Sequence, residues 1–289
     1  MGFCKTIKTV CRKKRSRRSL ARLLLTHILC TIFFLGIPAL CAAPADKVFI
    51  YFYSSETNIN NFKSLKMGFD KYLAEYGPYE FQPFEDRETF EEHIKDKEKC
   101  LLLLSSWHFK NIYNDYGLRF ALTGLRNGKK YQQRILVALD TVLSTDDVVG
   151  TSIASASSVE HTKSAVAGMF EEEDTAAKTS ILSVSKDLDA LMCVGFGMST
   201  AALTTRNSFE ELKKINPLLH GKMKILAEGL ESLSLIMAVP AGFTEQAVQP
   251  INVIKSMTMN PDGMKKMQML GLDGWQKPEL SDRQILETR

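Results

Sequence analysis

Three short segments rich in hydroxyl side chains are the residues in this sequence best suited to hold a ligand. They cover residues 54–57, 105–107 and 155–158, and each lies where a strand is predicted to give way to a helix. Hydroxyl groups and the first N–H groups of a helix donate hydrogen bonds, and the helix dipole favours a negative charge. Such neutral donors suit a tetrahedral oxyanion. The predicted ligand-binding residues are Ser54, Ser55, Ser105, Ser106, Ser155, Ser157 and Ser158, with Tyr53 and Trp107 as aromatic walls.

Each of these features also has a structural explanation. Serine is a common helix cap, so a single serine-rich turn indicates little by itself. An isolated aromatic side chain more often packs in a core than binds a ligand. His108 and His161 lie near the same junctions, where a local hydrogen bond is the simpler role. Arg126 and Lys129–Lys130 lie on a predicted turn and are expected to be solvated.

The elements that would position these segments alternate between strand and helix. An apolar run at residues 101–104 is typical of a strand buried on both faces of a parallel sheet. Asp86 is a predicted helix cap. The pattern predicts an α/β fold with a parallel sheet and right-handed crossovers. The first unit has predicted strands at 48–53, 79–84 and 100–104, and helices at 61–76 and from Asp86 onward.

A second α/β unit follows, so we expect two lobes with a cleft between them. Residues 118–125 and 132–139 are predicted strands joined by an Asn127-Gly128 turn, a strong turn signal. The chain would cross outward at 132–139 and return at 234–239. Further predicted strands are 151–156, 179–184 and 198–203, and predicted helices are 157–169, 187–194, 209–215 (capped by Ser208), 245–259 and 261–270, before a loose tail after Trp275.

Residues 1–45 predict an export signal or a membrane anchor. Nine of the 37 basic residues precede Asp46, no acidic residue does, and an apolar run at 23–40 follows them. Ala43-Pro44-Ala45 has the form of a cleavage site, and the apolar run is long enough to span a bilayer if it is retained. Lipidation at Cys41 is the weaker alternative. We therefore expect the folded part in the periplasm or on the outer face of the cytoplasmic membrane. The predicted divisions are 1–45 (leader), 46–139 (first part of lobe 1), 140–233 (lobe 2) and 234–289 (return crossing and C-terminal helices).

Several classes of function are disfavoured by the composition. Beyond the leader, 28 basic residues face 33 acidic ones, whereas a nucleic-acid binder spreads cations over its folded surface. No phosphate-binding glycine loop, nucleophile elbow or metal-binding cluster is present, so we expect no enzyme, no cofactor and no metal. Cys100 and Cys193 sit among apolar residues and are expected to be buried thiols.

Parts of the second half resemble a known family. Residues 150–158, Gly-Thr-Ser-Ile-Ala-Ser-Ala-Ser-Ser, look like a strand followed by a hydroxyl-rich ligand loop. Residues 189–192 with 195–203 look like a helix and strand of the same family, and residues 209–212, 216–217 and 270–275 also resemble its sequences. Over residues 46–275 the chain resembles the phosphate/phosphonate-type substrate-binding components of ABC transporters, which implies the type II periplasmic-binding fold. Thr200 stands where many members have Asp, which removes the counter-charge for an amine-bearing ligand.

The resemblance implies an extracytoplasmic solute-binding protein that captures phosphate, a phosphonate or a similar small oxyanion for an ABC transporter. The implied partners are the small anion and an ABC permease or membrane sensor, with no nucleic acid and with membrane contact through residues 23–40 alone. The alternative is a membrane-anchored sensory or scaffold relative of the same fold that has no transport role.

Overall fold

The computed structural model describes residues 47–56, 59, 61–170 and 178–287. The predicted leader at 1–45 and Thr57 of the first hydroxyl segment lie outside these residues. Within them, no helix has both the length and the apolar character needed to cross a membrane.

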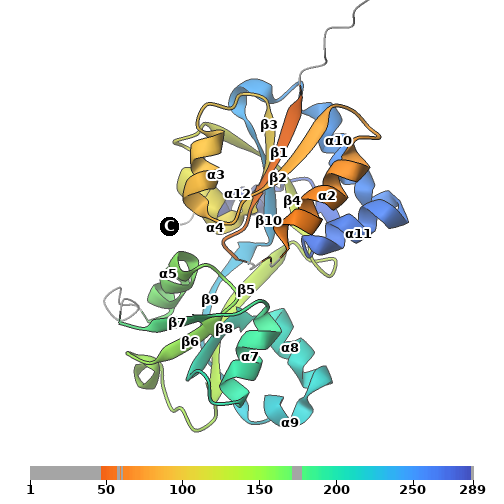
Figure 1. Cartoon of the computed structure of the whole chain (residues 1–289). Helices are drawn as coiled ribbons and strands as arrows, with labels where there is room; N and C mark the ends of the chain where they lie inside the picture. The colour runs from red at the N-terminus through yellow and green to blue at the C-terminus, as the bar shows by residue number, and fades with distance from the viewer. Residues whose placement is uncertain (1–46, 57–58, 60, 171–177, 288–289) are drawn as a thin grey trace, which may run out of the picture. The chain divides into compact units, whose positions relative to one another are not determined.

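A six-stranded sheet organises the first lobe (Figure 1). Its order is β11-β4-β10-β3-β1-β2, and β1 runs parallel to both β2 and β3. β10 is antiparallel to β3 and β4, and β11 is antiparallel to β4. The strands are β1 (Val48–Tyr53), β2 (Tyr79–Pro83), β3 (Cys100–Ser105), β4 (Leu118–Leu125), β10 (Leu235–Pro240) and β11 (Gly274–Gln276).

Helices cover both faces of this sheet because β1 and β3 send apolar side chains to either side. Ile50 and Phe52 share a core with α2 (Phe62–Leu73), α10 (Val248–Ser256) and α11 (Pro261–Met269). Tyr51 and Tyr53 face α3 (Arg87–Ile94), α4 (Ser106–Ile112) and α12 (Leu280–Glu287). The side chains of residues 101–104 are fully buried, as their apolar run predicted. Asp86 caps α3 by accepting a hydrogen bond from the Thr89 N–H, which confirms that prediction.

The second lobe repeats this plan with a five-stranded sheet of order β7-β6-β8-β5-β9. β6 is parallel to β7 and β8, while β5 is antiparallel to β8 and β9. α7 and α8 share one core with the sheet, and α5 shares another. The elements are β5 (Tyr131–Leu139), β6 (Ser152–Ser155), α5 (Val159–Phe170), β7 (Ser180–Ser183), α7 (Asp187–Gly195), β8 (Ala201–Thr205), α8 (Arg206–Ile215), α9 (Pro217–His220) and β9 (Met223–Leu233). A 3-10 turn, Asp146–Val148, lies between β5 and β6, and two more, Ala241–Phe243 and Met257–Met259, follow β10.

The chain passes between the two sheets twice. The predicted Asn127-Gly128 turn forms, with φ of 52° and 70° and reciprocal backbone hydrogen bonds between Arg126 and Lys129. β4 and β5 do not pair with each other, however, because the turn delivers the chain from one sheet to the other. The return passes through Ser234, between β9 and β10.

Four expectations need correction. Each sheet is mixed rather than wholly parallel, because an antiparallel strand lies beside a set of three parallel ones: β10 beside β3, and β5 beside β8. β9 was not predicted. Thr205, not Ser208, caps α8, since its side chain accepts the Ser208 N–H. The tail after Trp275 is ordered into α12, in which Asp282 is fully buried.

Candidate functional site

The three predicted hydroxyl segments meet at one place. The hydroxyls of Ser55 and Ser105 lie 2.6 Å apart and are buried. The Ser158 N–H donates to the Ser55 carbonyl at 2.8 Å, and the Ser157 hydroxyl lies 3.5 Å from the Glu56 carbonyl. The carboxyl ends of β1 and β3 in one lobe therefore contact the carboxyl end of β6 in the other.

The serine hydroxyls at this junction bind groups of the chain itself. They hold turns and helix starts in place, which is the structural role that serine often has. The contacts are Ser54 Oγ accepting from the Glu56 N–H, Ser106 Oγ donating to the Leu233 carbonyl, Ser155 Oγ accepting from Thr162 Oγ1 and from the Ser157 N–H, and Ser158 Oγ accepting from the His161 N–H.

The two predicted aromatic walls differ in their surroundings. Tyr53 is buried beside Phe90 and His108. Burial, with the nearby Glu160 charge, raises the pKa of Tyr53 to about 12, although its hydrogen bond with Ser158 acts the other way. Trp107 is half-buried and reaches the second lobe, where its Nε1 donates to Ser164 Oγ at 3.2 Å.

The two histidines near the junction are both buried. His108 Nε2 lies 2.8 Å from Glu91 Oε1. The ring of His161 stands edge-on to Trp107, with centroids 5.4 Å apart. Burial, followed by the charge of Arg134, lowers the pKa of His161 to about 3. A neutral His161 therefore helps to join the lobes.

A charged group that the sequence analysis missed lies at the centre of the junction. Arg134 of β5 binds Asp187 at the start of α7, with Nη1 and Oδ1 2.8 Å apart. Its Nη2 donates to the Glu56 carbonyl at 2.7 Å and lies 3.8 Å from the Glu56 carboxylate. Gln132, also on β5, donates to the same carboxylate. The second lobe thus holds both the backbone and the side chain of Glu56.

Glu56 is a carboxylate enclosed in protein. Its side chain is 3% exposed, and that of Arg134 is 5% exposed. Burial raises the pKa of Glu56, while the charges of Arg134 and Arg126, the Trp107 backbone N–H and the Gln132 amide act in the opposite direction. Three buried atoms here have no hydrogen-bond partner among the described residues: Glu56 Oε1, Gln132 Oε1 and Arg134 Nε. The group has unused hydrogen-bonding capacity on both the donor and the acceptor side.

Two basic residues at the crossing, Arg126 and Lys130, are less exposed to solvent than their position on a predicted turn led us to expect. Lys130 is 12% exposed and pairs with Asp282 at 2.9 Å and with Glu279 at 2.7 Å. Arg126 donates to the Gly271 carbonyl at 3.1 Å. The prediction that these two side chains are simply solvated was therefore wrong, although Lys129 is exposed.

A pocket of 640 Å³, lined mainly by polar residues, adjoins this crossing. Gln132 links the pocket to Glu56, and Ser234 of the return crossing contributes a buried hydroxyl without a partner among the described residues. The other residues that line the pocket include Arg126, Lys129, Thr205, Arg206 and Gln276.

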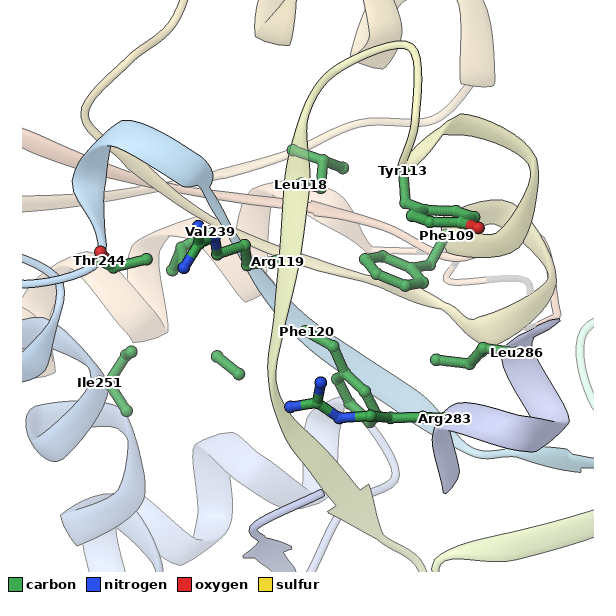
Figure 2. Close-up of a pocket in the computed structure, with 11 residues that line it drawn as sticks. Phe109, Tyr113, Leu118, Arg119, Phe120, Val239, Thr244, Ile251, Arg283 and Leu286 are labelled. Carbon is green, nitrogen blue, oxygen red and sulfur yellow. The ribbon is translucent and has the colours of Figure 1, made fainter. Parts of the chain in front are cut away.

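A second pocket of 510 Å³ lies wholly in the first lobe (Figure 2). Phe109, Leu118 and Leu286 give it an apolar wall, and Phe120 and Arg283 also line it. None of the predicted ligand-binding residues lines it.

Across the part of the chain that the structure describes, no three His, Cys, Asp or Glu side chains are grouped to hold a metal ion. Cys100 and Cys193 are free, buried thiols, as predicted.

Comparison with known proteins identifies the fold. No protein-family model and no curated protein matches the sequence. Among solved structures, the binding protein component of an ABC phosphonate transporter from Pseudomonas aeruginosa matches with a TM-score of 0.59 and 14% identity, over 84% of this chain and 86% of that one. PhnD1 from Prochlorococcus marinus, in complex with methylphosphonate, matches with a TM-score of 0.58 and 14% identity, over 83% and 96%. This chain has the type II periplasmic-binding fold.

A further protein with this fold, XAC2383 from Xanthomonas citri bound to ATP, matches with a TM-score of 0.59 and 11% identity, over 84% of this chain and 95% of that one. The predicted fold class, a two-lobed periplasmic-binding fold, is confirmed. At these identities the likeness concerns the fold, so the ligand has to be argued from the interlobe residues of this chain.

Proposed function

We propose that this chain is an extracytoplasmic solute-binding protein that captures a small oxyanion, such as phosphate or a phosphonate, between its lobes for an ABC transporter. The observation that carries the proposal is the position of Arg134. Its guanidinium lies where the hydroxyl segments of both lobes converge, and it is already within 3.8 Å of an oxyanion, the Glu56 carboxylate. A guanidinium recognises carboxylates and phosphates through its planar array of donors.

Binding between lobes would be coupled to closure. The lobes are joined at two crossings, 126–130 and Ser234, which can act as hinges. A ligand held by Arg134 from the second lobe and by backbone or hydroxyl donors from the first lobe interacts fully when the lobes are together. Such a ligand binds the closed arrangement more tightly than the open one, and its binding therefore favours the closed state.

The proposed partners follow from this role. An ABC permease would receive the ligand, and residues 23–40 would give the membrane contact if they are retained after export. We propose a binder rather than an enzyme. Among the described residues, the junction serines bond to carbonyls, backbone N–H groups and other hydroxyls, and none bonds to a histidine ring or carboxylate that could act as a base. The relatives in fold named above are described as binding proteins or as ligand complexes.

Thermal unfolding in the presence of phosphate, phosphite and methylphosphonate tests the proposal. A ligand at 100 times its Kd stabilises the folded state by about 2.7 kcal/mol, which gives a measurable rise in Tm. The control is the double variant E56Q/R134Q, which removes the buried guanidinium together with the Glu56 carboxylate and leaves Asp187, the other partner of Arg134, in place. Wild type should shift and the double variant should not; no shift of the wild type with any of these anions would refute oxyanion capture.

A second candidate is the membrane-anchored sensory or scaffold relative. It is favoured by the interlobe bonds that the chain makes with its own groups, from Ser158 to Ser55, Trp107 to Ser164 and Arg87 to Glu160. These bonds could maintain one arrangement of the lobes for contact with another protein. N-terminal sequencing of the exported protein separates the two, because an intact leader favours the anchored relative and a cleaved one favours the transport component.

A further inference from the structure

We propose that Glu56 is an internal ligand of the interlobe site, whose carboxylate occupies the position of the oxyanion and has to leave before an external anion binds. This inference rests on the proposed function, because it concerns the same Arg134. The inference goes further by naming the Glu56 carboxylate as a group of the chain itself that competes with an external anion for that site.

The contacts of Glu56 are those of a bound anion. The residue follows β1 in the first lobe, yet its carboxylate is held by Gln132 and Arg134, both from β5 in the second lobe. Asp187 binds the other terminal nitrogen of Arg134 and fixes the direction of the guanidinium. The second lobe therefore supplies the side chains of a preformed receptor, while the first lobe supplies the anion and the backbone N–H of Trp107.

The carboxylate fits this receptor incompletely. Its Oε1 has no partner among the described residues, and neither does Nε of Arg134. A buried charge that leaves hydrogen bonds unmade carries a desolvation cost. The raised pKa of Glu56 reflects the same cost. A phosphonate or phosphate has a third oxygen that can accept from Arg134 Nε, and its protonated form can donate to Gln132 Oε1. An external oxyanion can thus satisfy atoms that Glu56 leaves without partners.

Internal competition has a measurable consequence. If Glu56 occupies the site for most of the time, the apparent Kd of an external anion rises in inverse proportion to the vacant fraction. Removing the carboxylate should therefore tighten binding. It should also leave a gap the size of a carboxylate beside Arg134, which a small free carboxylate such as acetate or formate can fill.

The test compares the full chain carrying E56A with the full chain carrying E160A. Glu160 also forms an interlobe ion pair, 3.1 Å from Arg87, but its side chain is 53% exposed and holds no buried cation. Acetate, at ionic strength matched with chloride, should raise the Tm of E56A by several degrees and leave E160A and wild type unchanged. Absence of an acetate-specific shift in E56A overturns the inference.

A second variant guards against misfolding of E56A. E56Q keeps the size of the side chain and removes its charge, and its Kd for methylphosphonate should fall by about tenfold relative to wild type. An unchanged Kd overturns the inference while the proposed function stands. If wild type gives no shift with any oxyanion, the proposed function fails, and the acetate response of E56A then decides by itself whether Glu56 fills an anion site.

Discussion

Acidification should weaken the fold through His161, and replacing this histidine with phenylalanine should remove that effect. The side chain is 5% exposed, and its Nδ1 has no hydrogen-bond partner among the described residues. The folded protein keeps the ring neutral because burial and the charge of Arg134 lower its pKa to about 3. In the unfolded chain, His161 instead has the ordinary histidine pKa of 6.5.

The direction and size of the effect follow from this difference. A histidine whose pKa is lowered by folding supports the folded state above pH 6.5, and this support is lost as the pH falls from 6.5 towards 3. Each pH unit in that window costs about 1.4 kcal/mol. His161 should therefore reduce the free energy of unfolding by about 2 kcal/mol at pH 5 relative to neutral pH.

Urea unfolding at pH 7.5 and pH 5.0 measures this directly. Other groups also titrate: His108 has a lowered pKa and acts in the same direction, while the raised pKa of Glu56 acts in the opposite one. The comparison of wild type with H161F cancels both contributions. H93F is the matched control, because it makes the same substitution at an exposed histidine. If H161F loses as much stability at pH 5 as wild type, the reasoning is refuted.

Three further predictions concern packing and reactivity. D282N should lower the free energy of unfolding by about 1–3 kcal/mol in urea titration, because it removes the buried carboxylate that binds Tyr131 and Lys130 and leaves Lys130 with Glu279 alone; an unchanged midpoint would contradict this. G263A should cost about 1–3 kcal/mol by the same assay, because a Cβ there would lie 2.3 Å from the Met257 carbonyl oxygen, so the backbone has to move. Cys100, whose pKa burial raises to about 12, should react with a thiol reagent at the rate of unfolding, and faster labelling in native conditions would count against its burial.

Local patterns in the sequence were enough to predict the first lobe's parallel core. The apolar run of β3 and the cap at Asp86 each depend on neighbouring residues, so no knowledge of distant contacts was needed. The meeting of residues 54–56 with 105–107 was also predictable, because the carboxyl ends of parallel strands lie at one edge of a sheet. Their contact with residues 155–158, which follow a strand of the second sheet, was expected from the predicted cleft between two lobes. What those hydroxyls bind was not, since their partners depend on the detailed packing.

The missed features depend on residues far apart in the sequence. Glu56 and Arg134 are 78 positions apart, and neither looks exceptional in its own segment. β9 escaped prediction because it is an edge strand whose side chains are mostly half-buried or exposed, so its apolar alternation is weak. α12 looked like a loose polar tail because its buried residue is Asp282, whose partners Lys130 and Tyr131 lie about 150 positions earlier.

The order of strands along the chain also affects how the protein reaches its native state. All the strands of the second sheet come from one uninterrupted stretch, 131–233, whereas β10 has to insert between β3 and β4 after that stretch has been synthesised. Contacts between distant parts of a chain form slowly because a long loop has to close first. We therefore expect the lobe that begins the folded chain to be completed last, so that a nascent chain exposes the unfilled gap beside β3 until β10 has been synthesised.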